Sequence, residues 1–395
     1  MLPVFAPITE NATVQYILRL SQKVSKEVNQ PYTIITADLA VAKKAYNIIW
    51  QNLQEFSNVV IRLGVFHFIC AYMGAVEKNL RGSGFEEIIL EAGICASGSI
   101  EKVMTGKHYN RALRVHKVVL EALERLLLQY LRSNSGDELD ESTWEAVMHL
   151  AKNPCKEKLR EALENPGCQK LLSLLTDLKA RIRKGELGKT PQYWLNYMDR
   201  VWLILELQRA TKTNSWNLHL ECLQKMCPLF FSYDHQNYAR YSTFYFLSML
   251  NLPNSHPGAE RLMEQNGFSV RRSDIPSSRN AVDITIEQTI NRYAKSHGGI
   301  IGFSRNQSAY YRWCTTRHAR GTYHQATLLL ADMDSQEIDS HKDLRSSQTA
   351  KSQDDVLNVM DAYITLVTRL IVITKIHFIA SPLGHLYQRM LRMTF

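Results

Sequence analysis

The first eighty residues alternate between two hydrophobic patterns. Apolar residues at helical spacing predict three helices, and two short β-branched and aromatic runs between them predict strands. The expected order is a helix over 13–29, a strand over 32–36, a helix over 39–52, a strand over 57–65 and a helix over 68–80. Such an order is typical of part of a mixed or parallel α/β sheet. Asp38 would then lie at the carboxyl end of a strand, where such sheets keep their sites.

From residue 82 to about residue 250 the pattern is helical throughout. The longest predicted helix covers 111–132, an acidic loop follows over 134–142, and further helices fill most of 143–225. No strand signal of comparable strength interrupts this stretch. The sequence therefore predicts an α/β fold with a large all-α part.

A short amphipathic helix with two acids in its first turns is predicted within 280–302. Asp283 and Glu287 lie one turn apart near its start, where the helix dipole favours negative charge, and Gly298 and Gly299 end it. A charged first turn without any chemistry would give the same pattern. A function for these acids therefore requires a partner acid from elsewhere in the chain.

The end of the chain changes in composition. Residues 332–355 are rich in Ser, Asp, Gln and Lys, which is typical of a mobile linker. The apolar stretch 356–380 is interrupted by charged side chains, and each charge at the centre of a membrane span costs about 2.5–3.5 kcal/mol. We therefore expect a docked helix here and no membrane partner.

Charge favours an anionic partner. The 395 residues carry a formal net charge of +9, which favours nucleic acid first and a membrane surface second. A group of basic residues opens the long helix, where phosphates could bind, although a solvated basic face is an ordinary alternative. This group contains Lys107, His108, Arg111, Arg114 and Lys117.

A second basic candidate is Arg240, in a segment over 233–241 that interleaves aromatic and polar residues. Aromatic rings among basic groups can stack nucleotides. An internal hydrogen-bonded corner would use the same residue types, so both interpretations stay open.

Carboxylates are the strongest candidates for chemistry. The seven cysteines form no CxxC pair, and the chain has neither a phosphate-binding GxxxxGK[ST] loop nor a GxSxG elbow. Two acids that meet at a strand end could bind Mg²⁺ or Mn²⁺ and carry out phosphoryl transfer. Asp38 and Glu287 are the proposed catalytic and metal-binding pair, and His67, Asp234 and Asp283 are accessory candidates.

Five stretches carry a resemblance to a known family. In order they are TADLAVAKKAYNIIW, VVIRLGVFHFICAYMG, SGSIEKVMTGKHYNRALRVHK, YDHQNYARY and VDITIEQTINRYAKSHGGIIGFSRNQSAYYRW. Between about Leu2 and Arg320 the chain resembles transposon-derived proteins of invertebrate genomes, which are similar to cut-and-paste transposases with a ribonuclease-H-like catalytic core. The resemblance implies that Asp38 is the second acid and Glu287 the third acid of that core.

The resemblance also implies a domain organisation. It divides the chain into a first core part over 1–80, a helical insertion over 81–269, a last core part with the acidic helix over 270–325, a flexible linker over 326–355 and a helical tail over 356–395. Met1 stands where the family's sheet would be half built, so a truncated start without the first three strands and the first acid is expected.

The expected function follows from the incomplete acid set. A site with two of three acids should bind metal poorly, so we expect a transposase-derived fragment without activity. DNA is the expected partner, and the nucleus is favoured over the cytoplasm. Two alternatives remain: a domesticated nucleic-acid-binding protein that uses the basic insertion, and a protein-interaction or structural module.

Overall fold

The chain divides into two compact units. The computed structural model describes residues 4, 6–134, 140–152, 156–274, 276–295, 306–330 and 350–366. The strand unit comprises Met1–Ala75 and Leu203–Lys342, and the helical unit comprises Val76–Trp202 and Asp343–Phe395. Helices α3 (Val65–Leu80) and α10 (Lys189–Thr213) contribute residues to both units.

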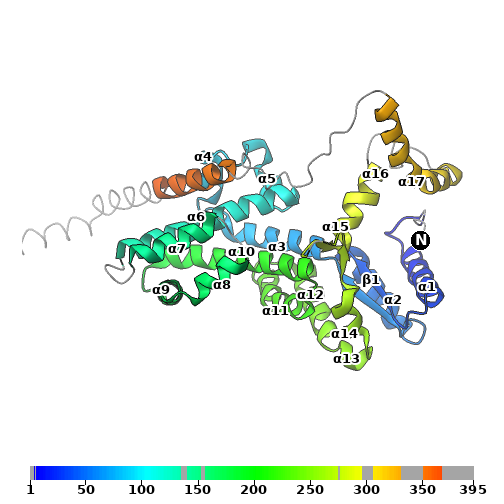
Figure 1. Cartoon of the computed structure of the whole chain (residues 1–395). Coiled ribbons are helices and arrows are strands. Elements are labelled where there is room, and N and C mark those ends of the chain that lie inside the picture. The colour runs from blue at the N-terminus through cyan, green and yellow to red at the C-terminus, as the bar shows by residue number, and fades with distance from the viewer. Residues whose placement is uncertain are drawn as a thin grey trace, which may run out of the picture. The chain divides into compact units, whose positions relative to one another are not determined.

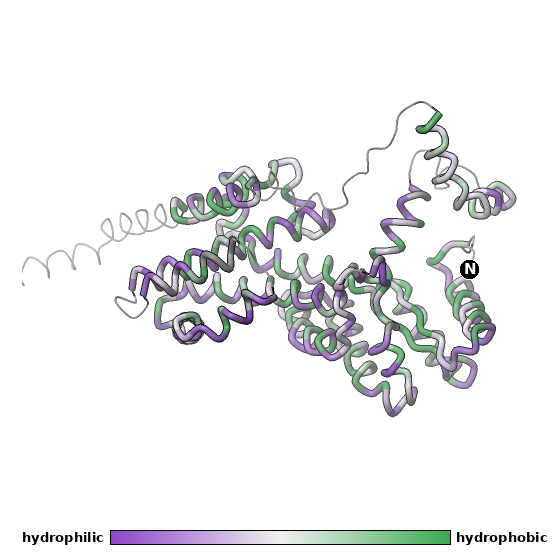
Figure 2. The backbone as a smooth tube through the Cα atoms, in the orientation of Figure 1, coloured by the Kyte–Doolittle hydropathy of each residue, from purple (hydrophilic) through white to green (hydrophobic). Residues whose placement is uncertain are grey.

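The strand unit begins with the alternation that the hydrophobic pattern predicts (Figure 1). Its first elements are α1 (Asn11–Glu27), β1 (Thr33–Ala37), α2 (Leu39–Gln51) and β2 (Val59–Leu63), followed by α3. The two strands pair in parallel, from Thr33 opposite Val59 to Ala37 opposite Leu63. The expected adjacency of the strands is therefore confirmed. Figure 2 shows hydrophilic and hydrophobic positions alternating along α1, as an amphipathic helix requires.

The later part of the strand unit is mainly helical. Its elements are α11 (Trp216–Ser232), α12 (Gln236–Leu250), α13 (Leu252–Ser255), α14 (Ala259–Leu262), η3 (Met263–Gly267), β3 (Ser269–Arg271), β4 (Arg279–Ala281), α15 (Val282–Ile286), η4 (Glu287–Asn291), α16 (Arg292–Lys295) and α17 (Gln307–Leu330). Strands β3 and β4 form an antiparallel pair that the sequence did not predict. The expected acidic helix is present as α15, η4 and α16, with a π-helical turn at η4. Its Gly298-Gly299 end lies outside the described residues.

Aromatic and arginine side chains form contacts between the first part of the strand unit, up to α3, and its later part, from α11 onward. Phe230 of α11 contacts Phe68 and Tyr72 of α3 edge to face. Arg62 of β2 is only 1% exposed. It donates hydrogen bonds to the carbonyl oxygens of Gly267 and Phe268, at 3.2 and 3.1 Å. A buried cation needs such partners, so this arginine fixes the start of β3 against β2.

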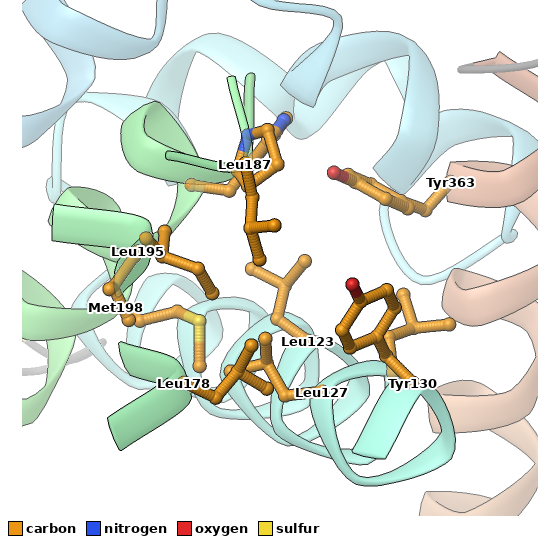
Figure 3. A pocket seen from close by; sticks show the side chains of 12 residues that line it. Leu123, Leu127, Tyr130, Leu178, Leu187, Leu195, Met198 and Tyr363 are labelled. Carbon is orange, nitrogen blue, oxygen red and sulfur yellow. The ribbon is translucent and has the colours of Figure 1, made fainter. Parts of the chain in front are cut away.

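The helical unit contains no strand among its described residues, as expected. Its elements are α4 (Phe85–Glu91), η1 (Ser97–Ser99), α5 (Ile100–Met104), α6 (Tyr109–Asn134), α7 (Glu141–Lys152), α8 (Lys156–Glu164), α9 (Pro166–Arg183), the first part of α10 and a helix over 350–366. An apolar pocket of about 330 Å³ lies within this unit. Leu123, Leu127, Leu178, Leu195 and Met198 line it beside Tyr130 and Tyr363 (Figure 3).

The division into units differs from the expected domain boundaries. Residues 203–269 were expected in the helical insertion, but they belong to the strand unit. The reason is packing, since α12 contacts both α2 and β2. The sequence pattern could show that 203–269 are helical, but it could not show against which residues those helices pack.

The expected linker and tail are only partly described. Residues 326–330 continue α17, and residues 350–355 are helical, so neither end of the expected 326–355 linker is irregular. Residues 331–349 lie outside the described residues. The expected helical tail is described as far as residue 366, and residues 367–395 lie outside.

The coarse fold prediction, α/β with a large all-α part, is confirmed. The described residues form two sheets of two strands each, so a fuller ribonuclease-H-like sheet remains an expectation. Among the described helices, none combines the length and the apolar character needed to cross a membrane.

Candidate functional site

The candidate site lies at the carboxyl edge of the parallel strand pair. Asp38 follows β1 directly, and Gly64 follows β2 directly. Because the strands are parallel and in register, the two residues lie at the same edge of the sheet. Asp38 caps helix α2, since its Oδ1 accepts a hydrogen bond of 2.9 Å from the backbone N–H of Val41. The predicted location of Asp38 at a strand end is therefore confirmed.

Asp283 reaches this edge from α15. Its Oδ1 accepts a 3.2 Å hydrogen bond from the backbone N–H of Phe66, and its Oδ2 accepts one of 3.0 Å from that of His67. These N–H groups belong to the first turn of α3, which has no partners for them within the helix. Asp283 as a whole residue is only 7% exposed. Asp283 thus caps a helix that starts more than two hundred residues earlier in the chain.

The same carboxylate binds the ring of His67. Nδ1 of His67 lies 3.0 Å from Oδ2 of Asp283. This hydrogen bond raises the pKa of His67 above 6.5, partial burial opposes the shift, and the charges of Asp283, Asp38 and Glu287 add to it. Acids from two segments, Asp38 after β1 and both Asp283 and Glu287 on the helix of α15 and η4, therefore act on one imidazole ring.

Glu287 lies on the π-helical turn η4 and is engaged within its own helix. Its carboxylate accepts hydrogen bonds from Asn291 at 2.8 Å and from Lys295 at 3.2 Å. Burial acts to raise the pKa of Glu287, but the hydrogen bonds from Asn291 and Lys295 outweigh it, so the pKa is lowered. Glu287 is therefore held as a carboxylate by a cation of its own helix.

A polar cleft opens beside this cluster. It has a volume of about 930 Å³ and is lined by Asp38, His67 and Asp234, with Lys43 and Lys44 of α2 among the other lining residues. Asp234 is exposed, so it belongs to the rim of the cleft. The cleft brings together three of the predicted site residues, and neither Glu287 nor Asp283 lines it.

The aromatic segment 233–241 is used for packing. The hydroxyl of Tyr238 donates to the carbonyl oxygen of His67 at 3.3 Å, and its ring stacks on Phe230 with centroids 5.1 Å apart. Tyr241 stacks on Tyr46 of α2 at 6.3 Å. The hydrogen-bonded corner is thus the interpretation that the structure favours over free nucleotide-stacking rings.

The observed donor set does not fit the expected Mg²⁺ or Mn²⁺ pair. Over the described part of the chain, no three His, Cys, Asp or Glu side chains are grouped so that they could hold a metal ion. Asp283 already accepts from two amides and a ring nitrogen, and Glu287 accepts from an ammonium group. Mg²⁺ keeps several waters and is held through one or two carboxylates, but here Asp283 and Glu287 direct their oxygens at donors of the chain itself.

The residues of the predicted basic surface differ in exposure, and one of them is in an ion pair. Lys107, Arg111, Arg114 and Lys117 are exposed along the start of α6, whereas His108 is half-buried. Arg114 forms an ion pair with Asp355 of the helix over 350–366. His116, in the same stretch, is fully buried, and this burial lowers its pKa to about 4. It therefore adds no charge at neutral pH.

Arg240 is exposed on α12, in the strand unit. It therefore belongs to a different unit from the basic residues of α6.

Sequence reasoning missed Gly64 and the two cleft lysines. A Cβ added to Gly64 would overlap the carboxylate of Asp283, lying 2.7 Å from its Cγ. The available signal was the glycine itself, since an isolated glycine inside the predicted strand 57–65 is typical of a close approach by another part of the chain. Lys43 and Lys44 were hidden among the residues of an ordinary amphipathic helix.

Comparison with known proteins gives a family match over most of the chain. A family described as a domain of unknown function, DUF8702, matches residues 1–376. The matched region continues beyond Arg320, where the transposase resemblance ended. No curated protein and no solved structure matches the chain.

Proposed function

The chain belongs to the DUF8702 family, and we propose that it is a transposase-derived protein that binds DNA without cutting it. In this proposal the strand unit is a part of a ribonuclease-H-like core, and the acid cluster is the remnant of its phosphoryl-transfer site. The resemblance of the five sequence stretches supports this origin. DNA as the partner, and with it a nuclear location, follows from the basic charge of the chain.

One observation carries the proposal. Asp38 from the end of β1, and Asp283 and Glu287 from one helix much later in the chain, all act on His67 at the carboxyl edge of two parallel strands. A carboxylate-based phosphoryl-transfer site is built at such an edge. In this chain, however, the oxygens of Asp283 and Glu287 are taken by amides, a ring nitrogen and an ammonium group. The acids thus lie at the edge where a phosphoryl-transfer site would be built, but the oxygens of Asp283 and Glu287 are used to stabilise the fold.

A DNA-binding surface is favoured by the start of α6. Lys107, two residues before the helix, and Arg111 and Lys117 in its first turns are exposed there, at intervals of four and six residues. Cations arranged in this way can follow a phosphate backbone and displace its counterions. This surface would serve binding whether or not the acid cluster has any activity.

The cleavage part of the proposal is tested with supercoiled DNA. The purified chain is incubated with a plasmid and either Mg²⁺ or Mn²⁺, and nicked product is measured on a gel. We expect no nicking above the level of the buffer, because the acids are not free to position a metal and a single misplaced group costs on the order of 100-fold in rate. Metal-dependent nicking that Glu287→Gln abolishes would overturn this part.

The binding part is tested separately by fluorescence anisotropy with a labelled duplex. We expect binding at low salt that weakens steeply as salt rises and needs no divalent cation. Absence of binding at low salt would refute the DNA-binding function. The result would then favour the protein-interaction alternative.

A further inference from the structure

The apolar pocket of the helical unit takes no part in the acid cluster or in the basic surface. It has a volume of about 330 Å³ and lies among α6, α9, α10 and the helix over 350–366 (Figure 3). Leu123, Leu178, Leu195 and Met198 line it, and none of these four is more than 5% exposed. A cavity of about 150 Å³ with such a lining holds one benzene ring, so this pocket has room for about two rings.

Contacts between described residues hold the walls of the pocket in place. The ring of Tyr363, in the helix over 350–366, meets the ring of Trp194 of α10 edge to face, with centroids 5.3 Å apart. The same helix contacts α6, where Arg125 donates to the side chain of Gln353 at 2.7 Å. Helices α6 and α9 also contact each other. The pocket is therefore bounded by helices that pack together within one unit.

Two tyrosine hydroxyls point into the pocket. Figure 3 shows the hydroxyl oxygens of Tyr130 and Tyr363 directed toward the space between the leucine side chains. Over the described part of the chain, neither hydroxyl takes part in a hydrogen bond. Burial raises the pKa of Tyr363 to about 12, so this hydroxyl keeps its proton at neutral pH and is a donor. Since polar groups in protein interiors are normally hydrogen-bonded, a ligand with an acceptor atom fits here.

The surroundings of the pocket favour an uncharged ligand. Among the described residues that line it, none is charged. Glu124 and Lys179 are adjacent in the chain to lining leucines, but they form an ion pair with each other at 2.8 Å. Trp202 also donates to Glu124, at 3.0 Å. A charged ligand would lose its hydration in this pocket without gaining an opposite charge.

We propose that this pocket binds a neutral, mostly hydrocarbon molecule of about two rings that carries a carbonyl oxygen. The rings fill the part lined by leucines, and the carbonyl oxygen accepts a hydrogen bond from the hydroxyl of Tyr363. Tyr363 is assigned as the donor because it is half-buried, whereas Tyr130 is 44% exposed and can donate to water. Ligand pockets of about 300–1,000 Å³ typically combine an apolar lining with a few polar groups that orient the ligand. This site goes beyond the proposed DNA binding.

Three naphthalene probes test the class of ligand. 2-Acetylnaphthalene carries the carbonyl, 2-ethylnaphthalene lacks it, and 2-naphthoate has a charge in its place. Their binding to the full chain is measured by displacement of prodan, a neutral and fluorescent naphthyl ketone. We expect one saturable site per chain. The ketone should bind about fivefold more tightly than the hydrocarbon, which corresponds to one net hydrogen bond, and the naphthoate should bind most weakly.

Two variants locate the site. Tyr363→Phe removes the hydroxyl and keeps the ring, so it should abolish the preference for the ketone and leave the affinity for 2-ethylnaphthalene unchanged. Leu127→Trp, at a half-buried position of the lining, should fill the pocket and weaken the binding of all three probes. Tyr16→Phe is the matched control, because Tyr16 is 54% exposed on α1 in the other unit, and it should change no affinity.

Several results would overturn the proposal. They are the absence of saturable binding to the wild type, equal affinities for the ketone and the hydrocarbon, and a preference for the ketone that survives in Tyr363→Phe. Binding that a folded Leu127→Trp variant leaves intact would also overturn it. If circular dichroism shows that Leu127→Trp is unfolded, the comparison of Tyr363→Phe with Tyr16→Phe still decides. None of these results depends on DNA, so the pocket and the proposed function can fail independently.

Discussion

At the scale of single residues, Asp283 has two structural tasks. It satisfies the backbone N–H groups of Phe66 and His67 and orients the ring of His67. A carboxylate at a helix N-terminus is stabilised by the helix dipole. Loss of this side chain would therefore loosen the start of α3 as well as the histidine.

The protonation of His67 offers a direct test of this pairing. We expect the pKa of His67 to lie above 6.5 and to fall toward that value in Asp283→Asn, because the neutral amide removes the charge and keeps a cap for α3. The shift can be followed by NMR titration of the ring protons. A wild-type pKa at or below 6.5 would contradict the Asp283–His67 hydrogen bond.

The same shift fixes the sign of the pH effect on stability. The folded chain binds the proton of His67 more tightly than the unfolded chain does. This contribution is fully present below about pH 6.5, the value of the unfolded histidine, and it is lost as the pH rises through the folded pKa. The difference in unfolding free energy between wild type and Asp283→Asn should shrink in that window.

Gly64→Ala tests the close approach of Asp283 to the backbone. The added Cβ would overlap the carboxylate, so the carboxylate must move and the caps on α3 weaken. We expect a loss of about 1–3 kcal/mol in the free energy of unfolding, measured with urea. Gly98→Ala is the control, since nothing lies within 4 Å of its added Cβ, and a comparable loss there would contradict the explanation.

How far single residues can be predicted from sequence depends on the range of their contacts. Asp38 was located correctly because the end of a strand is a local property. His67 and Asp283 were both selected as accessory residues, but their mutual hydrogen bond was not predicted, since 216 residues separate them. The engagement of Glu287 by Lys295 was equally hidden, because eight residues is more than the usual spacing of helical pairs.

At the scale of elements, α6 carries the prediction for DNA binding. The variant Lys107→Glu, Arg111→Glu should weaken duplex binding and reduce the slope of log affinity against log salt by about 0.9 for each lost phosphate contact. Arg114 is left unchanged because it pairs with Asp355. Fluorescence anisotropy at several salt concentrations measures the slope.

Lys225→Glu is the control for charge alone, since Lys225 is exposed on α11 in the other unit. It should change the affinity much less than the α6 variant. Equal losses in the two variants would mean that overall charge, and not the α6 surface, attracts the DNA. Arg240→Glu, measured alongside, reports on the second basic candidate.

Elements with a strong period were predicted well, and short ones were not. Helices α1, α2 and α6 and both parallel strands were expected within a few residues of their observed bounds. Strands β3 and β4 have three residues each and are held by long-range contacts such as that of Arg62 with Phe268. Such strands leave no alternation long enough to recognise in a sequence.

At the scale of the whole molecule, helical composition was predictable and the assignment of helices to units was not. In the sequence, residues 203–269 look like a continuation of the helical stretch. In the structure they belong to the strand unit, because their aromatic side chains pack against its first elements, as Phe230 does on Phe68. Periodicity reports which face of a helix is buried. It does not report the partner of that face.

The interruption of the strand unit by the helical segment also affects the order in which its contacts can form during synthesis. Chains are synthesised at about 5–20 residues per second, and 216 residues separate His67 from Asp283. The start of α3 therefore emerges from the ribosome on the order of ten to forty seconds before the carboxylate that caps it. During that delay the whole helical segment from Val76 to Trp202 is made, so the first N–H groups of α3 stay without their carboxylate cap until the later part of the strand unit is synthesised.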